Sequence, residues 1–240
     1  VYCRLRPMTI TEVQNGYKSV CESLSETEVG CFDARTNKWK SFAFDRVWGP
    51  DQSQQSVFQD VEPLALSVVD GYNACIFAYG QTGSGKTFTM EGSEENNQYG
   101  ISYRTIQKIF HLLKLRAQQQ RAAEMFVGDE NEDEPATEVA FTFSLQVGML
   151  EIYNDEIYDL LNTAGSSVAE KKEGAMKAGG KTSLEIRRNK EGRVEVPDLT
   201  KEKVDSIQAV MELLKRGNSN RATATTDMNE HSSRSHMVLT

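Results

Sequence analysis

The sequence lacks the features that mark membrane-spanning and secreted proteins. Its longest apolar stretches, Cys75 to Tyr79 and Val139 to Leu150, fall well short of the roughly 18 to 20 residues that a transmembrane helix needs. We therefore expect no membrane span. The first residues, VYCRLRP, contain neither the apolar core of a signal peptide nor an initiator Met, so nothing directs the chain to secretion. The chain is expected to begin within a longer protein.

Cysteine is also scarce, and acidic residues outnumber basic ones. The four cysteines, Cys3, Cys21, Cys31 and Cys75, show no CxxC spacing, so we expect no cysteine metal site and predict reduced core thiols of a cytosolic protein. The net charge of -8 argues against a nucleic acid as the main partner, because binding DNA or RNA usually requires a broad basic surface.

What remains is the composition of an ordinary globular protein. Hydrophobic residues make up 38% and charged residues 26% of 240 residues, which suits one α/β domain. Runs rich in β-branched and aromatic residues predict strands at 1–5, 41–47, 73–79 and 139–153. Helical patterns lie between these runs. This alternation predicts an α/β fold with a mostly parallel central sheet flanked by helices.

Helix boundaries can be predicted from capping residues. Ser102 is expected to cap one helix, and Asp205 begins a capping-box-like start for another that Gly217 suits as the C-terminal residue. The stretch 54–71 also has a helical pattern, which Pro63 should break or kink.

Two stretches interrupt the alternation and are predicted to be surface insertions. Residues 118–138 end in an acidic, proline-containing half that cannot bury enough apolar area to order itself. Residues 163–181 are small, flexible and basic.

A phosphate-binding loop follows the predicted strand 73–79. The sequence GQTGSGKT matches G-x-x-x-x-G-K-[ST], and its residues are Gly80, Gln81, Thr82, Gly83, Ser84, Gly85, Lys86 and Thr87. The glycines allow positive φ and close backbone approach, so that N–H groups can point at phosphate oxygens. Lys86 supplies a cation for the β- and γ-phosphates and Thr87 a hydroxyl for Mg²⁺. The loop predicts nucleotide binding, but it fits many NTPases, kinases and GTPases included.

A dense polar stretch, NEHSSRSH, lies at 229–236 and leads into an apolar strand. Its hydroxyls, amide and guanidinium could ligate Mg²⁺, orient a water and sense a γ-phosphate, as a switch loop does. A serine-rich loop without such a role fits the residues alone equally well.

The two motifs together resemble the kinesin family, whose phosphate loop and switch I they match. The resemblance covers nearly the whole chain and includes four further stretches: RLRP at 4–7, FAFDRVWGP at 42–50, GYNACIFAYGQTGSGKT at 71–87 and LEIYNDEIYDLL at 150–161. It implies a P-loop NTPase fold of the kinesin motor type, with ATP and Mg²⁺ as cofactors.

The resemblance also implies roles for the residues that bind the nucleoside. Arg4, Arg6 and Pro7 match the family's adenine site, and the ring of Phe88 adds a face on which a base can stack. Without the family pattern, the alternative for Arg4 and Arg6 is a pair of surface charges on an edge strand.

Further roles concern the γ-phosphate. In the family pattern Ser233 joins Thr87 at Mg²⁺ and Ser232 positions the attacking water. Asn229 contacts the γ-phosphate region, and Arg234 pairs with an acidic residue of switch II.

Switch II itself is not found. No Asp in the sequence is followed by Gly three residues later, as the family's D-x-x-G requires. Residues 1–240 are therefore expected to be a partial motor domain that stops after switch I, without switch II, the main microtubule-binding helices or the neck. Such a piece should lack a closed catalytic site and expose a sheet edge.

A basic region follows the LEIY stretch. From Glu170 to Lys203 there are ten Lys or Arg and seven Asp or Glu, a local balance of 10 − 7 = +3. Kinesins use a loop in this region to contact acidic tubulin, so the resemblance makes four residues candidates for microtubule contact: Arg187, Arg188, Lys190 and Arg193. A solvated charged hairpin is the alternative.

The resemblance thus implies a microtubule-stimulated ATPase that moves along microtubules. The motif sequences are most similar to those of motors with a C-terminal head, which move toward the minus end. A plus-end motor and a depolymerase stay open as alternatives. The alternatives are a nucleotide-binding microtubule scaffold without turnover and, less in keeping with NEHSSRSH, a small-molecule kinase. The intact protein is expected to dimerise through a coiled coil and to reside in the cytoplasm on microtubules, the spindle included.

Overall fold

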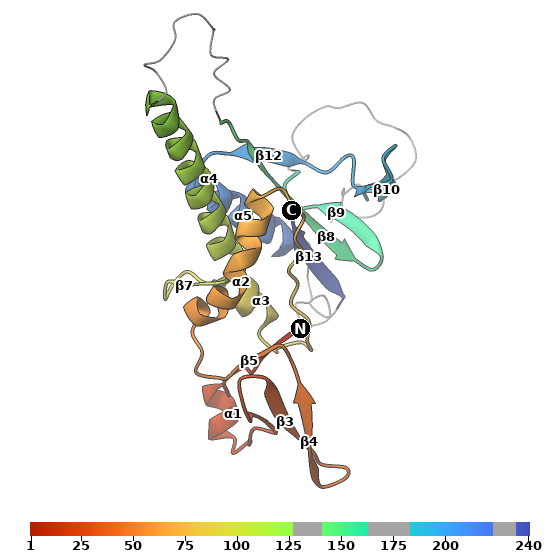
Figure 1. Cartoon of the computed structure of the whole chain (residues 1–240). Helices are drawn as coiled ribbons and strands as arrows, with labels where there is room; N and C mark the ends of the chain where they lie inside the picture. Colours follow the sequence, from red (N-terminus) through yellow and green to blue (C-terminus); the bar gives the residue numbers. More distant parts are fainter. Residues whose placement is uncertain (127–140, 163–182, 223–233) are drawn as a thin grey trace, which may run out of the picture. The chain divides into compact units, whose positions relative to one another are not determined.

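The computed structural model describes residues 1–126, 141–162, 183–222 and 234–240 (Figure 1). The chain forms two compact units, Val1–Ile109 and Phe110–Thr240. The long helix α4 (Ile101–Phe126) begins in the first unit and continues in the second. Within the described ranges, every helix is too short or too polar to cross a membrane.

The first unit contains small sheets. Its strands are β1 (Tyr2–Arg4), β2 (Cys21–Ser23), β3 (Glu28–Asp33), β4 (Lys38–Ala43), β5 (Arg46–Trp48), β6 (Gly92–Ser93) and β7 (Gln98–Tyr99). The order β2-β3-β4 forms an antiparallel sheet, whereas β1 and β5 pair in parallel. The single strand predicted at 41–47 is thus two strands. The chain changes partner after Ala43, because the amide of Asp45 already bonds to the carbonyl of Val1 (3.0 Å).

The prediction of a strand at 73–79 is wrong. The segment has no strand partner among the described residues, and the side chains of Phe77 and Tyr79 are 80% and 96% exposed. Apolar composition gives a segment strand propensity, but a strand also needs a neighbour for its backbone hydrogen bonds. Only Ile76 of this stretch packs onto the buried cluster of the first unit.

Three helices contribute to that cluster, namely α2 (Gln54–Val69), α3 (Lys86–Met90) and the start of α4. Helix α1 (Ile10–Gln14) buries no residue. Ser53 caps α2, which buries Val57 and Val61 against Trp48. The helix is not broken at Pro63, as the sequence suggested it could be. Burial of this apolar face compensates for the one backbone hydrogen bond that proline removes.

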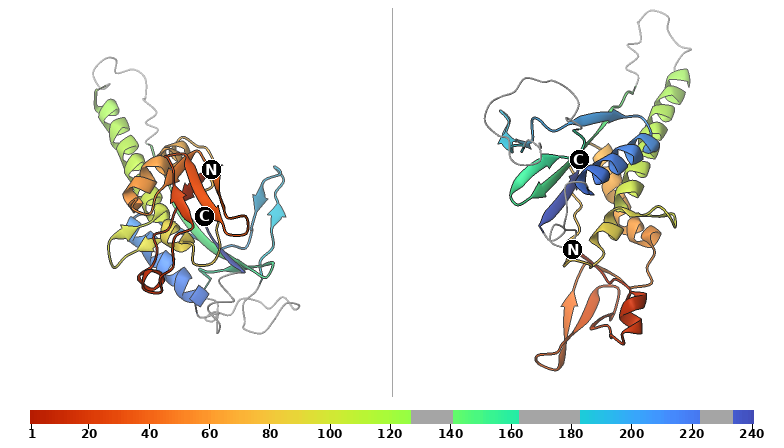
Figure 2. Two further views of the ribbon diagram at one scale, coloured as in Figure 1. Left: turned by 90° about the horizontal axis from the view of Figure 1, so that it is seen from below. Right: turned by 180° about the vertical axis from the view of Figure 1, so that it is seen from behind.

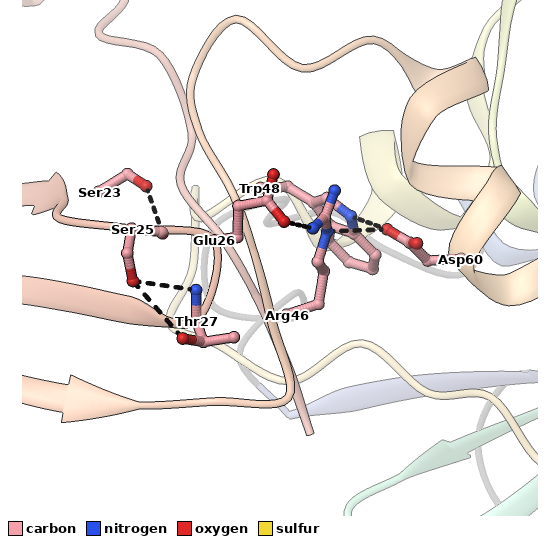
Figure 3. A network of polar contacts seen from close by, with 7 residues as sticks. All are labelled: Ser23, Ser25, Glu26, Thr27, Arg46, Trp48 and Asp60. Atoms are coloured by element: carbon pink, nitrogen blue, oxygen red, sulfur yellow. Dashed lines mark hydrogen bonds and ion pairs between the residues drawn. The ribbon is translucent and has the colours of Figure 1, made fainter.

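A polar network fastens β5 to α2 (Figure 3). The indole Nε1 of Trp48 donates to Asp60 Oδ2 (2.7 Å), and Arg46 Nε lies 3.3 Å from the same oxygen. The other end of the Arg46 guanidinium bonds to Glu26, which lies between β2 and β3. Because β5 pairs with β1, the network holds in place the strand that carries Arg4.

The second unit is built on the long strand β8 (Leu145–Tyr153). Its other strands are β9 (Glu156–Asp159), β10 (Arg187–Arg188), β11 (Val194–Glu195), β12 (Lys201–Val204) and β13 (Ser235–Leu239). Strands β9, β12 and β13 all pair with β8 in antiparallel fashion, and β10 and β11 form a separate hairpin. Helix α5 (Ile207–Ala222) packs against β8, as seen from behind in Figure 2.

Helix boundaries in this unit differ from those predicted. Helix α5 does not end at Gly217 but continues to Ala222, because Gly217 faces the fully buried Met149 of β8. Its cap is Ser206, one residue later than predicted, whose Oγ accepts from the amide of Ala209 (3.3 Å). Helix α4 extends to Phe126 and so takes up the start of the insertion predicted at 118–138. The rest of that insertion, and all of 163–181, lie outside the described residues.

Candidate nucleotide-binding site

The motif Gly80–Thr87 follows the unpaired segment 73–79, and its last two residues, Lys86 and Thr87, begin helix α3. Gly83 and Gly85 have φ of 78° and 95°, values that favour glycine. Gly80 does not have a positive φ, contrary to our expectation for all three glycines. A Cβ there would lie 2.5 Å from Ser84 Oγ, so the hydroxyl of Ser84 would have to turn away. The backbone geometry therefore fits a loop that wraps closely around a polyphosphate.

Lys86, the first residue of α3, folds back across this loop. Its Nζ donates to the carbonyl oxygens of Gly80 and Gln81, both at 2.9 Å. Thr87 follows it in α3, with an exposed side chain. The ammonium thus lies at the loop where phosphate oxygens are expected, and both residues fit the roles assigned to them for phosphate and Mg²⁺.

A cavity of about 500 Å³ adjoins the loop within the first unit. Six of the predicted nucleotide-binding residues line it: Arg4, Arg6, Pro7, Ser84, Gly85 and Phe88. Residues 50–55 and 97–98, Leu5, Thr89 and Arg104 complete its wall. The motif RLRP and the phosphate loop, far apart in sequence, therefore meet at one cavity.

Arg4 is held rigidly in this wall. Its Nη1 donates to Gln54 Oε1 (2.9 Å) and Thr89 Oγ1 (3.0 Å), and its Cζ lies 5.3 Å from the ring centre of Phe88. Burial lowers the pKa of the guanidinium, which stays protonated at neutral pH. A ring face of Phe88 is therefore covered by Arg4, so the two side chains present one combined surface to a base.

Arg6 is oriented by helix α1. Its Nη2 lies 2.6 Å from Glu12 Oε1, and Glu12 Oε2 accepts from the amide of Thr9 (2.7 Å) in a capping box. These hydrogen bonds, that from Arg6 first, lower the pKa of Glu12 to about 2. Glu12 therefore stays ionised and keeps Arg6 at the cavity.

The sequence reasoning missed Gln54. This side chain is only 5% exposed, and its Nε2 donates to the carbonyl oxygens of Phe88 (2.5 Å) and Gln98 (3.4 Å). Together with its bond to Arg4, these contacts join α2, β1, α3 and β7 around the cavity. The available signal was its place beside the Ser53 cap on the apolar face of α2, where a buried amide requires partners.

The switch I residues are only partly described. Asn229, Ser232 and Ser233 lie outside the described residues, so their predicted contacts with Mg²⁺, water and phosphate stay predictions. Arg234 is exposed at the turn that leads into β13. The next residue, Ser235, is buried and begins that strand.

The predicted microtubule-contact residues gather on one exposed hairpin. Arg187 and Arg188 form β10, and Lys190 and Arg193 belong to the turn before β11. Arg187 pairs with Glu185 (3.0 Å), and Asn189 Oδ1 shapes the turn by accepting from the amide of Arg193 (2.9 Å). The structure thus places four basic side chains together in solvent.

These observations agree with comparisons to known proteins. A family model described as the kinesin motor domain matches residues 4–240. A solved structure titled as that of a fast kinesin superposes with a TM-score of 0.74 and 27% identity, covering 99% of this chain and 57% of that one. The chain therefore belongs to the kinesin motor domain family, with its α/β P-loop NTPase fold.

Similar sequences include kinesin-like proteins of plants. The chain is 40% identical over 240 residues to Kinesin-like protein KIN-14Q of Arabidopsis thaliana. It is 38% identical over 241 residues to Kinesin-like protein KIN-14E of Oryza sativa subsp. japonica. These matches cover 99% and 100% of this chain but 17% and 19% of those proteins, so the chain spans about a fifth of their length. The resemblance to kinesins is confirmed.

Proposed function

We propose that this chain binds Mg²⁺–ATP and that the complete protein hydrolyses it to drive movement along microtubules. The observation that carries the proposal is the meeting of RLRP and the phosphate loop at one cavity in a chain of the kinesin family. In the proposed complex, Arg4 and Phe88 contact the base and Lys86 contacts the phosphates. Bound ATP supplies a γ-phosphoryl group for transfer to water.

Thr87 and the switch I residues complete the proposed reaction. Thr87 and Ser233 hold Mg²⁺, Ser232 and Asn229 orient the water and the γ-phosphate, and Arg234 pairs with an acidic residue of switch II. We propose that switch II, the main microtubule-binding helices and the neck belong to the complete protein beyond residues 1–240. Turnover is therefore proposed for the complete protein, and nucleotide binding for this chain.

ATP turnover by the full-length protein, measured with and without microtubules, tests the motor. We expect microtubules to raise the rate several-fold. The alternative is a scaffold that binds nucleotide and microtubules without turnover, and no specific feature of the described site favours it. A full-length protein that binds both but releases no phosphate would establish the scaffold and refute the motor.

Lys86→Ala tests the nucleotide site by itself. The variant removes the only side-chain cation of the phosphate loop, so we expect it to weaken ATP binding by at least about 100-fold, near the value of two lost charge-assisted hydrogen bonds. Binding of a fluorescent ATP analogue to residues 1–240 measures this. Lys38→Ala, on the exposed strand β4, is the matched control. Equal affinity of the two variants would refute the site.

The hairpin β10–β11 is proposed to contact the microtubule. Its basic side chains would be attracted by the acidic surface of tubulin, an effect that weakens with salt. We expect Lys190→Glu with Arg193→Glu to raise the microtubule concentration for half-maximal ATPase about tenfold at low ionic strength. The difference should shrink near 0.15 M salt, where the Debye length is about 8 Å. Lys38→Glu is the control. If it raises the microtubule concentration for half-maximal ATPase as much, the attraction is nonspecific and the hairpin has no special role.

The remaining expectations concern the complete protein. We propose that it dimerises through a coiled coil outside residues 1–240 and acts on cytoplasmic microtubules, those of the spindle included. We propose movement toward the minus end because its motif sequences resemble those of motors with a C-terminal head. Gliding of polarity-marked microtubules over the full-length protein measures this direction.

A further inference from the structure

A buried charged side chain, Glu151, lies in the middle of the second unit. It is 2% exposed in strand β8, and its Oε1 accepts hydrogen bonds from Ser235 Oγ (2.5 Å) and Arg221 Nε (3.1 Å). Arg221 Nη2 also donates to Ser235 Oγ (2.7 Å). Three side chains from β8, α5 and β13 therefore form one closed hydrogen-bonded triangle.

The strand register explains why these groups meet. Met237 lies directly opposite Glu151 in the β8–β13 pair, and Ser235 is two residues before it, on the same face of the sheet. Arg221 stands one residue before the end of α5. That end is fastened a second time by Asn220, whose Nδ2 donates to the carbonyl oxygen of Leu160 (2.9 Å).

The positions of these anchors in the sequence suggest a role. Arg221 and Ser235 are 14 residues apart, and the interval between them contains Asn229, Ser232 and Ser233, the predicted γ-phosphate and Mg²⁺ residues. Ser235 is only two residues from Ser233. At about 3.5 Å per residue, a displaced Ser235 cannot leave Ser233 unaffected. The described ends of the interval are therefore held together on one carboxylate.

Stability alone does not account for the triangle. Desolvation of a buried ion pair offsets much of its attraction, and apolar residues of similar volume often serve as well or better. What the arrangement does provide is a fixed position for two chain ends. Oε1 of Glu151 binds both Arg221 at the end of α5 and Ser235 at the start of β13.

We propose that Glu151 is a positioning residue for ATP hydrolysis, which acts through Arg221 and Ser235 by fixing both ends of the switch I interval. This inference rests on the proposed function. Misplacement of reacting groups by about 1 Å can cost about 100-fold in rate. ADP binding depends on the phosphate loop and the cavity of the first unit, so it should be insensitive to Glu151.

The test uses the full-length protein and the substitutions Glu151→Gln and Ser235→Ala. Glu151→Gln keeps the volume and removes the charge, and Ser235→Ala removes only the bridging hydroxyl. We expect the microtubule-stimulated kcat to fall about tenfold or more for Glu151→Gln and about threefold or more for Ser235→Ala. The KM for ATP, the ADP affinity and the number of nucleotide sites should stay within about twofold. The double variant should be no slower than Glu151→Gln, because both changes disrupt one network.

Glu202→Gln is the matched control. Glu202 of β12 pairs with Arg216 of α5 in the same unit, but that pair does not bracket the switch I interval. We expect its kcat to equal that of the wild type. Wild-type kcat for either test variant, or an equal loss in Glu202→Gln, would overturn the proposal. If Glu151→Gln does not fold, Ser235→Ala decides alone, since it leaves no charge unpaired.

Backbone hydrogen exchange separates this inference from the proposed function. Glu151→Gln and Ser235→Ala should exchange the amides of Ser235 to Met237 at least about fivefold faster than the wild type, whereas Glu202→Gln should not. This readout needs no turnover. A wild-type protein without ATPase activity would refute the proposed motor function. Unchanged exchange in both variants would refute the positioning role of Glu151.

Discussion

Gly217 offers the sharpest test of packing, because its expected effect has the opposite sign to that of an ordinary helical glycine. In an exposed helix, Gly→Ala stabilises by about 1 kcal/mol. In α5, a Cβ at Gly217 would lie 2.1 Å from Sδ and 2.9 Å from Cε of Met149, which is fully buried. Neither atom can remain in place.

The net magnitude follows from two opposing effects. Overpacking a buried site typically costs 1 to 3 kcal/mol, about 2 kcal/mol at its centre. Subtracting the helix gain of about 1 kcal/mol leaves a net loss of about 1 kcal/mol for Gly217→Ala. For a chain of this size, that lowers Tm by about 2 to 4 °C. Thermal unfolding followed by circular dichroism measures it.

Met149→Val provides the companion variant. Valine lacks the two atoms that the new methyl group would meet, so the methyl group of Gly217→Ala can occupy part of the space they leave. We expect the double variant to be more stable than the sum of the single effects predicts, by about 1 kcal/mol or more. A Tm raised by Gly217→Ala alone, or strictly additive effects, would refute the proposed contact between α5 and β8.

Two further predictions concern titratable side chains of the first unit. The pKa of Glu12 lies at about 2, so the stabilising contact with Arg6 is fully present above pH of about 4.5 and is lost as pH falls through 2. Arg6→Ala should raise the Glu12 titration midpoint measured by NMR, whereas Arg35→Ala should not move it. Cys21 and Cys31 lie directly opposite each other with Sγ atoms 2.8 Å apart, so hydrogen peroxide should oxidise them to one intramolecular disulfide, with loss of two hydrogens and formation of two waters. Burial, and then the neighbouring thiols, raise the pKa of Cys21 to about 11, so the reaction should accelerate as pH rises toward that value. Peptide mapping that finds no such bond would contradict this geometry.

Short motifs predicted much of the local backbone geometry, because this geometry is encoded in a few neighbouring residues. Gly83 and Gly85 adopt the positive φ that the phosphate loop requires. Arg4 and Phe88 also meet at one cavity, as the resemblance implied. Their direct contact could not be foreseen, because it depends on the buried amide of Gln54, which also binds Arg4.

Longer elements were predicted less accurately, since their extent depends on partners distant in sequence. The segment 73–79 has strand composition but no strand partner among the described residues. Gly217 has the residue type of a helix end, yet its missing side chain serves close packing against Met149. In both cases local propensity was correct for an isolated segment, and tertiary contacts decided otherwise.

The two hydrogen bonds of Lys86 have a consequence for how tightly a nucleotide can bind. Its ammonium group already satisfies the carbonyl oxygens of Gly80 and Gln81, so an incoming phosphate must compete with the protein's own backbone for the same donors. Affinity then reflects an exchange of partners, in which the released carbonyls return to water as the phosphate is engaged. The two hydrogen bonds are reversible, and they keep the cation of Lys86 at the loop when no phosphate is bound.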